Sequence, residues 1–214
     1  MKSKNIFNRR GFLKKTALLS VGTGSLMSLP FVGEANILPT QTNLNIFGPR
    51  EGYTPQISYL VSMMDWMRMV ITSQVKNLSI EELDYLHDDD ANTIGAMLMH
   101  LAATERFYQI NTFDGKRWGD WSDKDKQDWD VASGLGVKAR KEIKGNDISY
   151  YLEKIETVRT FTLQELAKRD DDWLLAVDND FPWGPTNNLC KWFHVCEHES
   201  NHNGQIKFLK SRVG

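Results

Sequence analysis

The stretch 187–210 reads NNLCKWFHVCEHESNHNGQIKFLK and predicts one long helix, with Thr186 as its N-cap. It contains three histidines at a spacing of four, which are His194, His198 and His202. At about 100° per residue they lie at roughly −40°, 0° and +40° on a helical wheel, and Gln205 lies at about −20°. One face of this helix therefore carries three imidazoles and an amide.

Two histidines at i and i+4 can hold one metal ion because their ring nitrogens converge over one turn. The outer two of the three are about 12 Å apart along the axis, so all three cannot easily bind one ion. The opposite ligand would be His100, in the middle of another predicted helix. Three histidines with an open fourth position are typical of catalytic zinc, which ionises a water or a substrate thiol. The alternatives are a solvated polar stripe and a hydrogen-bonded core histidine.

Periodic apolar residues predict three further long helices. They span about 54–77, 93–111 and 148–168, with caps at Thr54, Asn92 and Asp147. A capping-box pattern at Ser79 predicts one short helical turn. Strand-like alternation is nearly absent. The fold class is therefore all-α, an antiparallel four-helix bundle with a long insertion between helices 2 and 3.

The insertion, residues 112–146, is polar and charged but contains Trp118, Trp121 and Trp129. A connection of this length inside a compact domain is uncommon and often functional. The alternative is a lid over the core that the three tryptophans anchor.

Charge is unevenly distributed along the chain. Its 214 residues hold 26 Lys and Arg against 28 Asp and Glu, a net charge of −2. Residues 1–35 contain six basic side chains and one acidic one, so the remainder carries −7. Such an acidic domain is not expected to bind nucleic acid, which favours a basic excess. The basic start is typical of a targeting segment.

Residues 8–14 (NRRGFLK) resemble the twin-arginine export motif. A weakly apolar stretch follows, and Gly33 and Ala35 are the small residues that signal peptidase reads, with cleavage after Ala35. The stretch is too short and too rich in Gly and Ser for a membrane span; the alternative is a frayed basic amphipathic N-terminus. We expect a signal peptide at 1–35, a linker at 36–52 and a periplasmic or secreted domain at 53–214, with no membrane anchor after cleavage.

The two cysteines, Cys190 and Cys196, fall in the same predicted helix. At a spacing of six they lie about 240° apart, so they cannot bridge each other. Both are expected to be small buried residues.

Two motifs together resemble the DinB/YfiT-like superfamily of metal-binding bundles. Residues 198–206 (HESNHNGQI) resemble its HxxxH-x-GQ signature, and residues 93–105 (TIGAMLMHLAATE) resemble the helix that supplies its first histidine. The resemblance runs from Tyr53 to about Leu209. It implies helices in up-down-down-up order and a divalent metal on His100, His198 and His202. Zinc or nickel is the expected metal, with iron and manganese as alternatives.

Characterised members of this superfamily include thiol S-transferases that use bacillithiol or mycothiol, a mycothiol-dependent isomerase and metal-dependent hydrolases. The resemblance therefore implies a small-molecule substrate, among them low-molecular-weight thiols. It also implies a homodimer, which is common in the superfamily.

The sequence departs from the superfamily pattern at two positions. The arginine that commonly follows the last metal histidine is Asn203 here, so any anion contact made by that arginine is missing. His194 is an additional imidazole one turn before the pair. We expect His194 and Gln205 to support the ligands or line the pocket, with plain packing as the alternative for His194.

No catalytic base is identified. Three glutamates near the histidines, Glu105, Glu197 and Glu199, all lie off the histidine face of the wheel. Glu105 is expected to have an interhelical or surface role, and His87, beside three aspartates, is expected to be solvated.

Two functions of different class follow. The first is an exported metal-dependent enzyme, a thiol S-transferase or hydrolase that acts on a small substrate. The second is a metal-binding or interaction module without turnover, which the missing base and arginine favour. An open pocket at the metal would favour the enzyme, and a fully ligated site would favour the module.

Overall fold

The computed structural model describes residues 44–213. The expected signal peptide and residues 36–43 of the expected linker lie outside these residues. Residues 44–52 contact the first long helix through Arg50, whose backbone N–H donates to Ser58 Oγ at 3.0 Å and whose Nε donates to Ser62 Oγ at 3.1 Å. No helix among the described residues is long and apolar enough to span a membrane.

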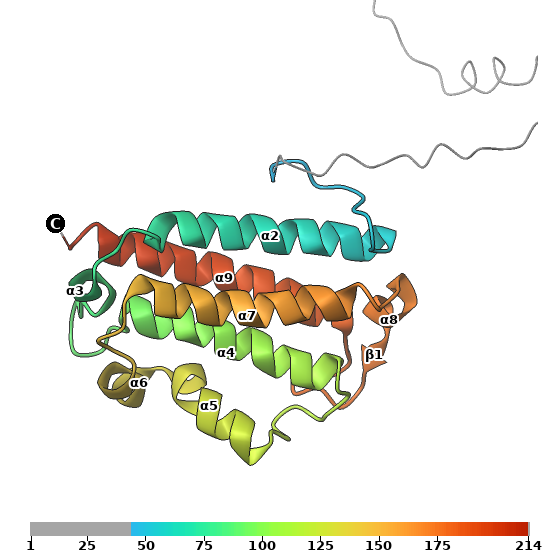
Figure 1. The fold of residues 1–214 in the computed structure, drawn as a ribbon. Helices are drawn as coiled ribbons and strands as arrows, with labels where there is room; N and C mark the ends of the chain where they lie inside the picture. Colours follow the sequence, from blue (N-terminus) through green and yellow to red (C-terminus); the bar gives the residue numbers. More distant parts are fainter. Residues whose placement is uncertain (1–43, 214) are drawn as a thin grey trace, which may run out of the picture. The chain divides into compact units, whose positions relative to one another are not determined.

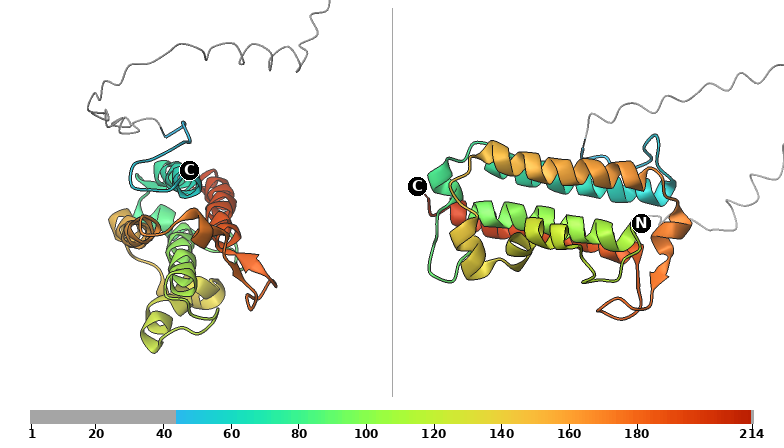
Figure 2. Two further views of the ribbon diagram at one scale, coloured as in Figure 1. Left: turned by 90° about the vertical axis from the view of Figure 1, so that its right-hand side faces the viewer. Right: turned by 60° about the horizontal axis from the view of Figure 1, so that its bottom comes forward.

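Four long helices form the bundle that the sequence predicts (Figure 1). They are α2 (Pro55–Val75), α4 (Ile94–Thr112), α7 (Ile148–Leu166) and α9 (Asn188–Lys210). The end-on view in Figure 2 shows the four around a common centre. The fold class is therefore confirmed as an all-α bundle with an insertion between its second and third helices.

The helices run in up-down-down-up order, as the resemblance implied (Figure 1). Helices α4 and α7 are parallel neighbours, and their first turns meet where Tyr151 packs on Gly95. A Cβ at Gly95 would lie 2.6 Å from Tyr151 Oη, so only glycine permits this approach. Helices α2 and α9 are also parallel, and near their last turns Lys210 Nζ donates to the Gln74 carbonyl at 2.5 Å.

Shorter elements connect the long helices. The insertion contains α5 (Asp123–Gly134) and α6 (Gly136–Glu142), which lie outside the bundle on the side of α4 (Figure 2). The remaining elements are α3 (Ile80–Leu83), α8 (Asp171–Leu175) and the antiparallel pair β1 (Val177–Asp178) and β2 (Thr186–Asn187), in which Val177 faces Asn187. The sequence did not predict α8 or the strand pair, because elements of two to five residues carry no periodic signal.

Two predicted N-caps are wrong by one residue. Thr93, not Asn92, caps α4 by accepting from the Ala96 N–H, and the Asn92 side chain accepts from the Gly136 N–H instead. Asn187, not Thr186, caps α9 by accepting from the Cys190 N–H at 2.9 Å. Thr186 is taken up by the pairing of β2 with β1. A distant contact thus uses the Asn92 side chain, whereas the Thr186 hydroxyl donates to the nearby Gly184 carbonyl at 2.9 Å.

The cap of α2 is also supplied from a distance. Thr54 occupies the N-cap position, but its side chain donates to Asp171 and makes no cap bond. The Asp171 carboxylate accepts from the Gln56 N–H at 3.1 Å and so caps the helix from α8. Asp147 and Ser79 cap α7 and α3 as predicted.

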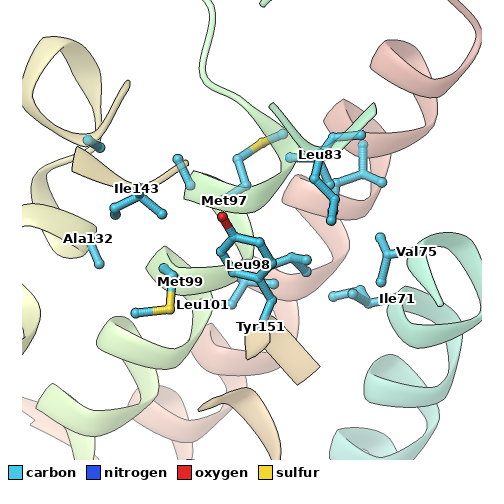
Figure 3. Close-up of a cluster of buried hydrophobic side chains, with 14 of the residues drawn as sticks. Ile71, Val75, Leu83, Met97, Leu98, Met99, Leu101, Ala132, Ile143 and Tyr151 are labelled. Carbon is cyan, nitrogen blue, oxygen red and sulfur yellow. The ribbon is translucent and has the colours of Figure 1, made fainter. Parts of the chain in front are cut away.

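Two large apolar clusters lie toward opposite ends of the bundle, and a third, small one contains Ala102, Ile155 and Val158. The cluster in Figure 3 contains Ile71, Leu98 and Tyr151 and lies where α4 and α7 begin. The other contains Met64, Tyr108 and Trp192 and lies where these helices end. Cys196 belongs to this second cluster, whereas Cys190 is exposed, so the expectation that both cysteines are buried is wrong for Cys190.

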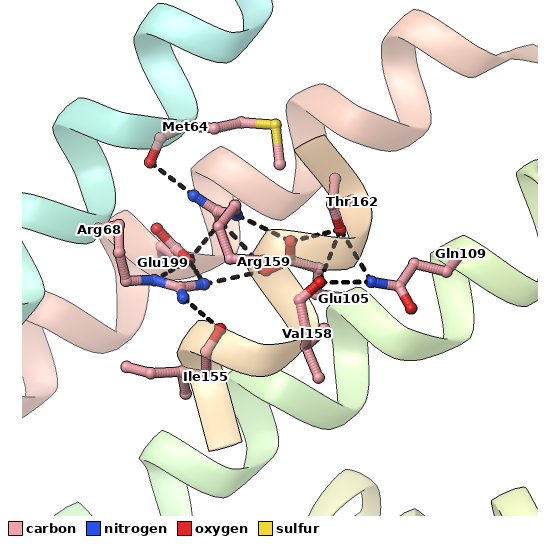
Figure 4. A network of polar contacts seen from close by, with 9 residues as sticks. All are labelled: Met64, Arg68, Glu105, Gln109, Ile155, Val158, Arg159, Thr162 and Glu199. Atoms are coloured by element: carbon pink, nitrogen blue, oxygen red, sulfur yellow. Dashed lines mark hydrogen bonds and ion pairs between the residues drawn. The ribbon is translucent and has the colours of Figure 1, made fainter. Parts of the chain in front are cut away.

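A buried ionic network separates the two clusters and joins all four long helices (Figure 4). It consists of Arg68 on α2, Glu105 on α4, Arg159 on α7 and Glu199 on α9, each less than a tenth exposed. Arg159 Nε donates to Glu105 Oε1 at 2.8 Å, and Arg68 Nη2 donates to Glu199 Oε1 at 2.7 Å. Each arginine also contacts the other glutamate, at 2.9 Å in both cases. Glu105 therefore has the interhelical role that was expected as one of two alternatives.

The network holds Glu105 in its charged form. Burial alone would raise the pKa of this carboxyl, but the guanidiniums of Arg159 and Arg68 outweigh it and the net pKa is lowered. Thr162 Oγ1 adds a hydrogen bond to Glu105 Oε1 at 2.7 Å.

We predict that Glu105→Ala lowers the free energy of unfolding by about 3–5 kcal/mol, because two buried guanidiniums lose a shared carboxylate. Urea unfolding followed by circular dichroism measures the change. Lys124→Ala is the control, since it removes an ion pair with Asp128 in which the lysine side chain is 82% exposed, and it should leave the midpoint unchanged. Equal effects of the two substitutions would contradict a structural role for the network.

Candidate metal centre

Three histidines converge between α4 and α9. His100 projects from α4, and His198 and His202 project from successive turns of α9. One ring nitrogen from each lies within 4.8 Å of the other two. The shortest separation, between His100 Nε2 and His198 Nε2, is 2.8 Å. The structure thus brings together the three residues proposed from the sequence as ligands.

Hydrogen bonds at the far side of two rings set their tautomers. His100 Nδ1 lies 3.0 Å from the carbonyl oxygen of Ala132 in α5, and His202 Nδ1 lies 3.1 Å from Gln205 Oε1. The Gln205 amide is itself oriented, since its Nε2 donates to Asn201 Oδ1 at 3.2 Å. Because these oxygens only accept, each Nδ1 carries the proton and each Nε2 keeps its lone pair. Such outer contacts typically orient metal-binding histidines.

The imidazoles are neutral at physiological pH. Burial and the neighbouring histidines lower the pKa of His198 to about 3, and burial and His100 lower that of His202 to about 4. Burial also lowers the pKa of His100 against the effect of its contacts with the backbone of Ala132 and Ser133. Neutral imidazoles are the form that binds metal, so no proton has to be removed first.

This donor set fits a divalent metal ion. Two Nε2 atoms 2.8 Å apart require a proton or a cation between them, because two facing lone pairs repel. Three nitrogen donors suit zinc, nickel, copper or iron better than calcium or magnesium, which prefer oxygen. A metal-free hydrogen bond between His198 and His100 is the alternative, and metal analysis distinguishes the two.

The other singled-out residues lie outside this group of three. The ring of His194 lies 5.3 Å from that of His198, and its Nδ1 contacts the Tyr108 hydroxyl at 2.9 Å. His87 is exposed and packs against Phe208. Asn203 is buried, and its Oδ1 has no hydrogen-bond partner among the described residues.

None of the three glutamates reaches the histidine group. Glu105 and Glu199 are held in the buried network, and Glu197 is half exposed, 3.9 Å from His194 Nε2. The structure therefore supplies no carboxylate base beside the three imidazoles within residues 44–213.

A cavity of about 360 Å³ opens beside the histidines and includes His100, His198 and His194 in its wall. The insertion contributes Trp118, Trp121 and Ser133 to the same wall. Trp129 packs against the apolar core, and Trp118 does so as well as lining the cavity. The insertion is therefore anchored on the core by two of its tryptophans, as one of the two alternatives expected.

Two contacts of this centre could not be predicted from the sequence. The Ala132 carbonyl is a backbone group 32 residues from His100, and no side-chain pattern could reveal it. Tyr108 lies two turns after His100 on α4 and reaches His194 on α9. Its position resembles any other apolar core position, so only the packing of α4 on α9 identifies it.

We predict that the metal-free protein loses stability as the pH falls from about 6.5 toward 4. A histidine in the unfolded chain has a pKa of about 6.5, so the unfolded state binds more protons than the folded state over this range. Urea midpoints of chelator-treated protein, measured at several pH values, test this. The double variant His198→Asn/His202→Asn should show a shallower pH dependence, and His87→Asn should show the wild-type slope. Identical slopes in all three proteins would contradict the lowered pKa values.

Comparison with known proteins adds one assignment. No match was found among curated proteins. The family model for mycothiol S-transferase matches residues 59–213, a span that includes most of α2, all of α4, α7 and α9, and the three converging histidines. On this match the chain belongs to the mycothiol S-transferase family, a DinB-like family.

Proposed function

We propose that this protein is a metal-dependent thiol S-transferase that joins a small thiol to an electrophilic substrate. The observation that carries the proposal is the convergence of three neutral imidazoles, two of which, His100 and His198, lie in the wall of a cavity. Membership of the mycothiol S-transferase family supports a small thiol as one substrate. A divalent metal held by His100, His198 and His202 supplies a positive charge that lowers the pKa of a thiol, so that the thiolate is present near neutral pH.

The reaction needs little else from the chain. The sulfur forms a bond to an electrophilic carbon, the bond from that carbon to its leaving group breaks, and the leaving group departs with the electron pair. The thiol proton goes to solvent, so the missing carboxylate base is no obstacle. The contacts of Ala132 with His100 and of Gln205 with His202 keep the imidazoles in place for this step.

Metal identity is part of the proposal. Zinc or nickel is proposed because both bind imidazole nitrogen well, with iron and manganese as the alternatives that the superfamily resemblance left open. A homodimer is proposed on the superfamily resemblance alone.

We predict about one equivalent of metal in the purified full-length protein by elemental analysis. His100→Ala, His198→Ala and His202→Ala should each lose most of it, because two imidazoles hold a divalent ion far more weakly than three. His87→Ala is the matched control, since His87 is exposed and outside the group, and it should keep its metal.

A transfer assay on the same proteins decides between the enzyme and the alternatives. Mycothiol and bacillithiol are each mixed with iodoacetamide, a small electrophile without a ring, and the loss of free thiol is followed. Acceleration by wild type and by His87→Ala, but not by the three ligand variants, supports the proposal. A metal-loaded protein without acceleration contradicts it and favours a non-catalytic metal-binding module or a hydrolase.

We also propose that the protein is exported. The support is the sequence alone: Arg9 and Arg10 in a twin-arginine-like motif, a weakly apolar stretch and small residues up to Ala35. The mature chain would begin at Asn36 with a linker to residue 52, followed by the bundle domain at 53–214.

We predict that wild type, expressed in a host with a twin-arginine system, is found outside the cytoplasm with Asn36 as its N-terminus. Arg9→Lys/Arg10→Lys should keep the uncleaved chain in the cytoplasm, because the translocon requires the paired arginines. Lys14→Arg/Lys15→Arg preserves the charge outside the pair and serves as the control. Export of the twin-lysine variant at wild-type level would refute this route.

A further inference from the structure

The cavity beside the three histidines has aromatic walls. Phe107 and Tyr108 come from α4, Trp118 and Trp121 from the segment between α4 and α5, and Trp183 from the turn between β1 and β2. These rings come from three separate parts of the chain and meet only in the folded protein. Trp183 is 57% exposed, so it contributes little to the buried core.

Ring contacts hold these walls in place. Phe107 and Trp121 stack with centroids 4.7 Å apart and planes 3° apart. Trp118 meets Trp121 edge-on at 5.3 Å. Trp183 meets the ring of His194 edge-on at 5.0 Å. These contacts fix the wall side chains relative to one another, and a wall rich in aromatic rings favours an aromatic ligand.

The cavity wall contains no Asp, Glu, Lys or Arg. Apart from the aromatic rings and histidines, its lining residues are Thr104 and Ser133. The Tyr108 hydroxyl is already engaged by His194 at 2.9 Å. A charged ligand group would lose its hydration here without gaining an ionic partner among the side chains of the wall, which is costly, and an anionic group bound to a metal on the histidines would take the place of the thiol. The larger cavity of about 650 Å³, in contrast, is lined by Asp88, Asp90 and Gln205.

We propose that this aromatic cavity binds the electrophilic substrate, and that this substrate is uncharged and carries a planar aromatic ring. That the ligand is an electrophile rests on the proposed transferase function. That it is an uncharged aromatic compound rests on the cavity alone. A volume of about 360 Å³ is at the lower end for small-molecule sites, which suits one or two fused rings. A ring in this cavity would lie against His100 and His198, which are two of the three histidines proposed to hold the metal and therefore lie close to the reacting sulfur.

The test compares two ligands of the same ring and different charge. Full-length, chelator-treated protein is titrated by calorimetry with 1,3-dinitrobenzene and with 3,5-dinitrobenzoate, without any thiol, so that no metal can bind the carboxylate. The uncharged ring should bind at least tenfold more tightly than the carboxylate. Equal affinities, tighter binding of the carboxylate, or no binding of dinitrobenzene would overturn the proposal.

Substitutions locate the binding site. Trp121→Ala and Trp183→Ala should each weaken dinitrobenzene binding several-fold, whereas Trp66→Ala should not, because Trp66 lies on α2 outside the cavity wall. Ser133→Lys places a cation in the wall without removing a ring and should reverse the preference toward dinitrobenzoate. Unchanged affinities in Trp183→Ala and Ser133→Lys would overturn the assignment even if Trp121→Ala fails to fold.

Binding is measured without turnover, so the two proposals can fail separately. Loss of thiol transfer with intact, Trp183-dependent ring binding would refute only the transferase. Thiol transfer to iodoacetamide without preference for the uncharged ring would refute only the aromatic ligand class.

Discussion

The buried network of Arg68, Glu105, Arg159 and Glu199 is the constraint on which the rest of the structure depends. It takes one charged residue from each long helix and lies between the two apolar clusters. Apolar clusters alone tolerate sliding of one helix past another, whereas four buried charges have partners in only one register. The network therefore fixes the axial position of α4 and α9, and with it the level at which His100 meets His198. Glu199 faces the network from the residue next to His198.

Around this frame the histidine group is built by three different parts of the chain. The helices bring the rings together, α5 supplies the Ala132 carbonyl that orients His100, and Gln205 orients His202 from the next turn of α9. The insertion then adds two tryptophans to the cavity wall. The same segment thus contacts His100 and lines the cavity beside it.

The differences between expectation and structure share one cause. Asn92 and Thr186 have good capping side chains, but Asn92 accepts from the first residue of α6 and Thr186 is paired with β1 through its backbone, so the adjacent residues become the caps. Asp171 caps α2 from a position more than a hundred residues away. The ionic role of Arg68 and Arg159 could not be predicted, because a single arginine on an apolar helix face gives no periodic signal. The role follows only from the glutamates that face these arginines in the folded protein. Sequence rules for caps and helix faces consider only neighbouring residues, whereas contacts with distant residues decide the roles of these side chains.

By itself the sequence determined the number and approximate bounds of the long helices, the insertion, and the histidine stripe of α9, because these follow from a 3.6-residue period within single segments. It also singled out His100, as a histidine in the middle of another predicted helix and then through the resemblance of that helix to a known motif. Only the tertiary structure decided that these three rings meet, that no carboxylate from residues 44–213 joins them, and that aromatic side chains from three segments line one cavity. Those facts depend on the register and the packing of helices that are far apart in sequence, and no spacing within one helix encodes the distance to another.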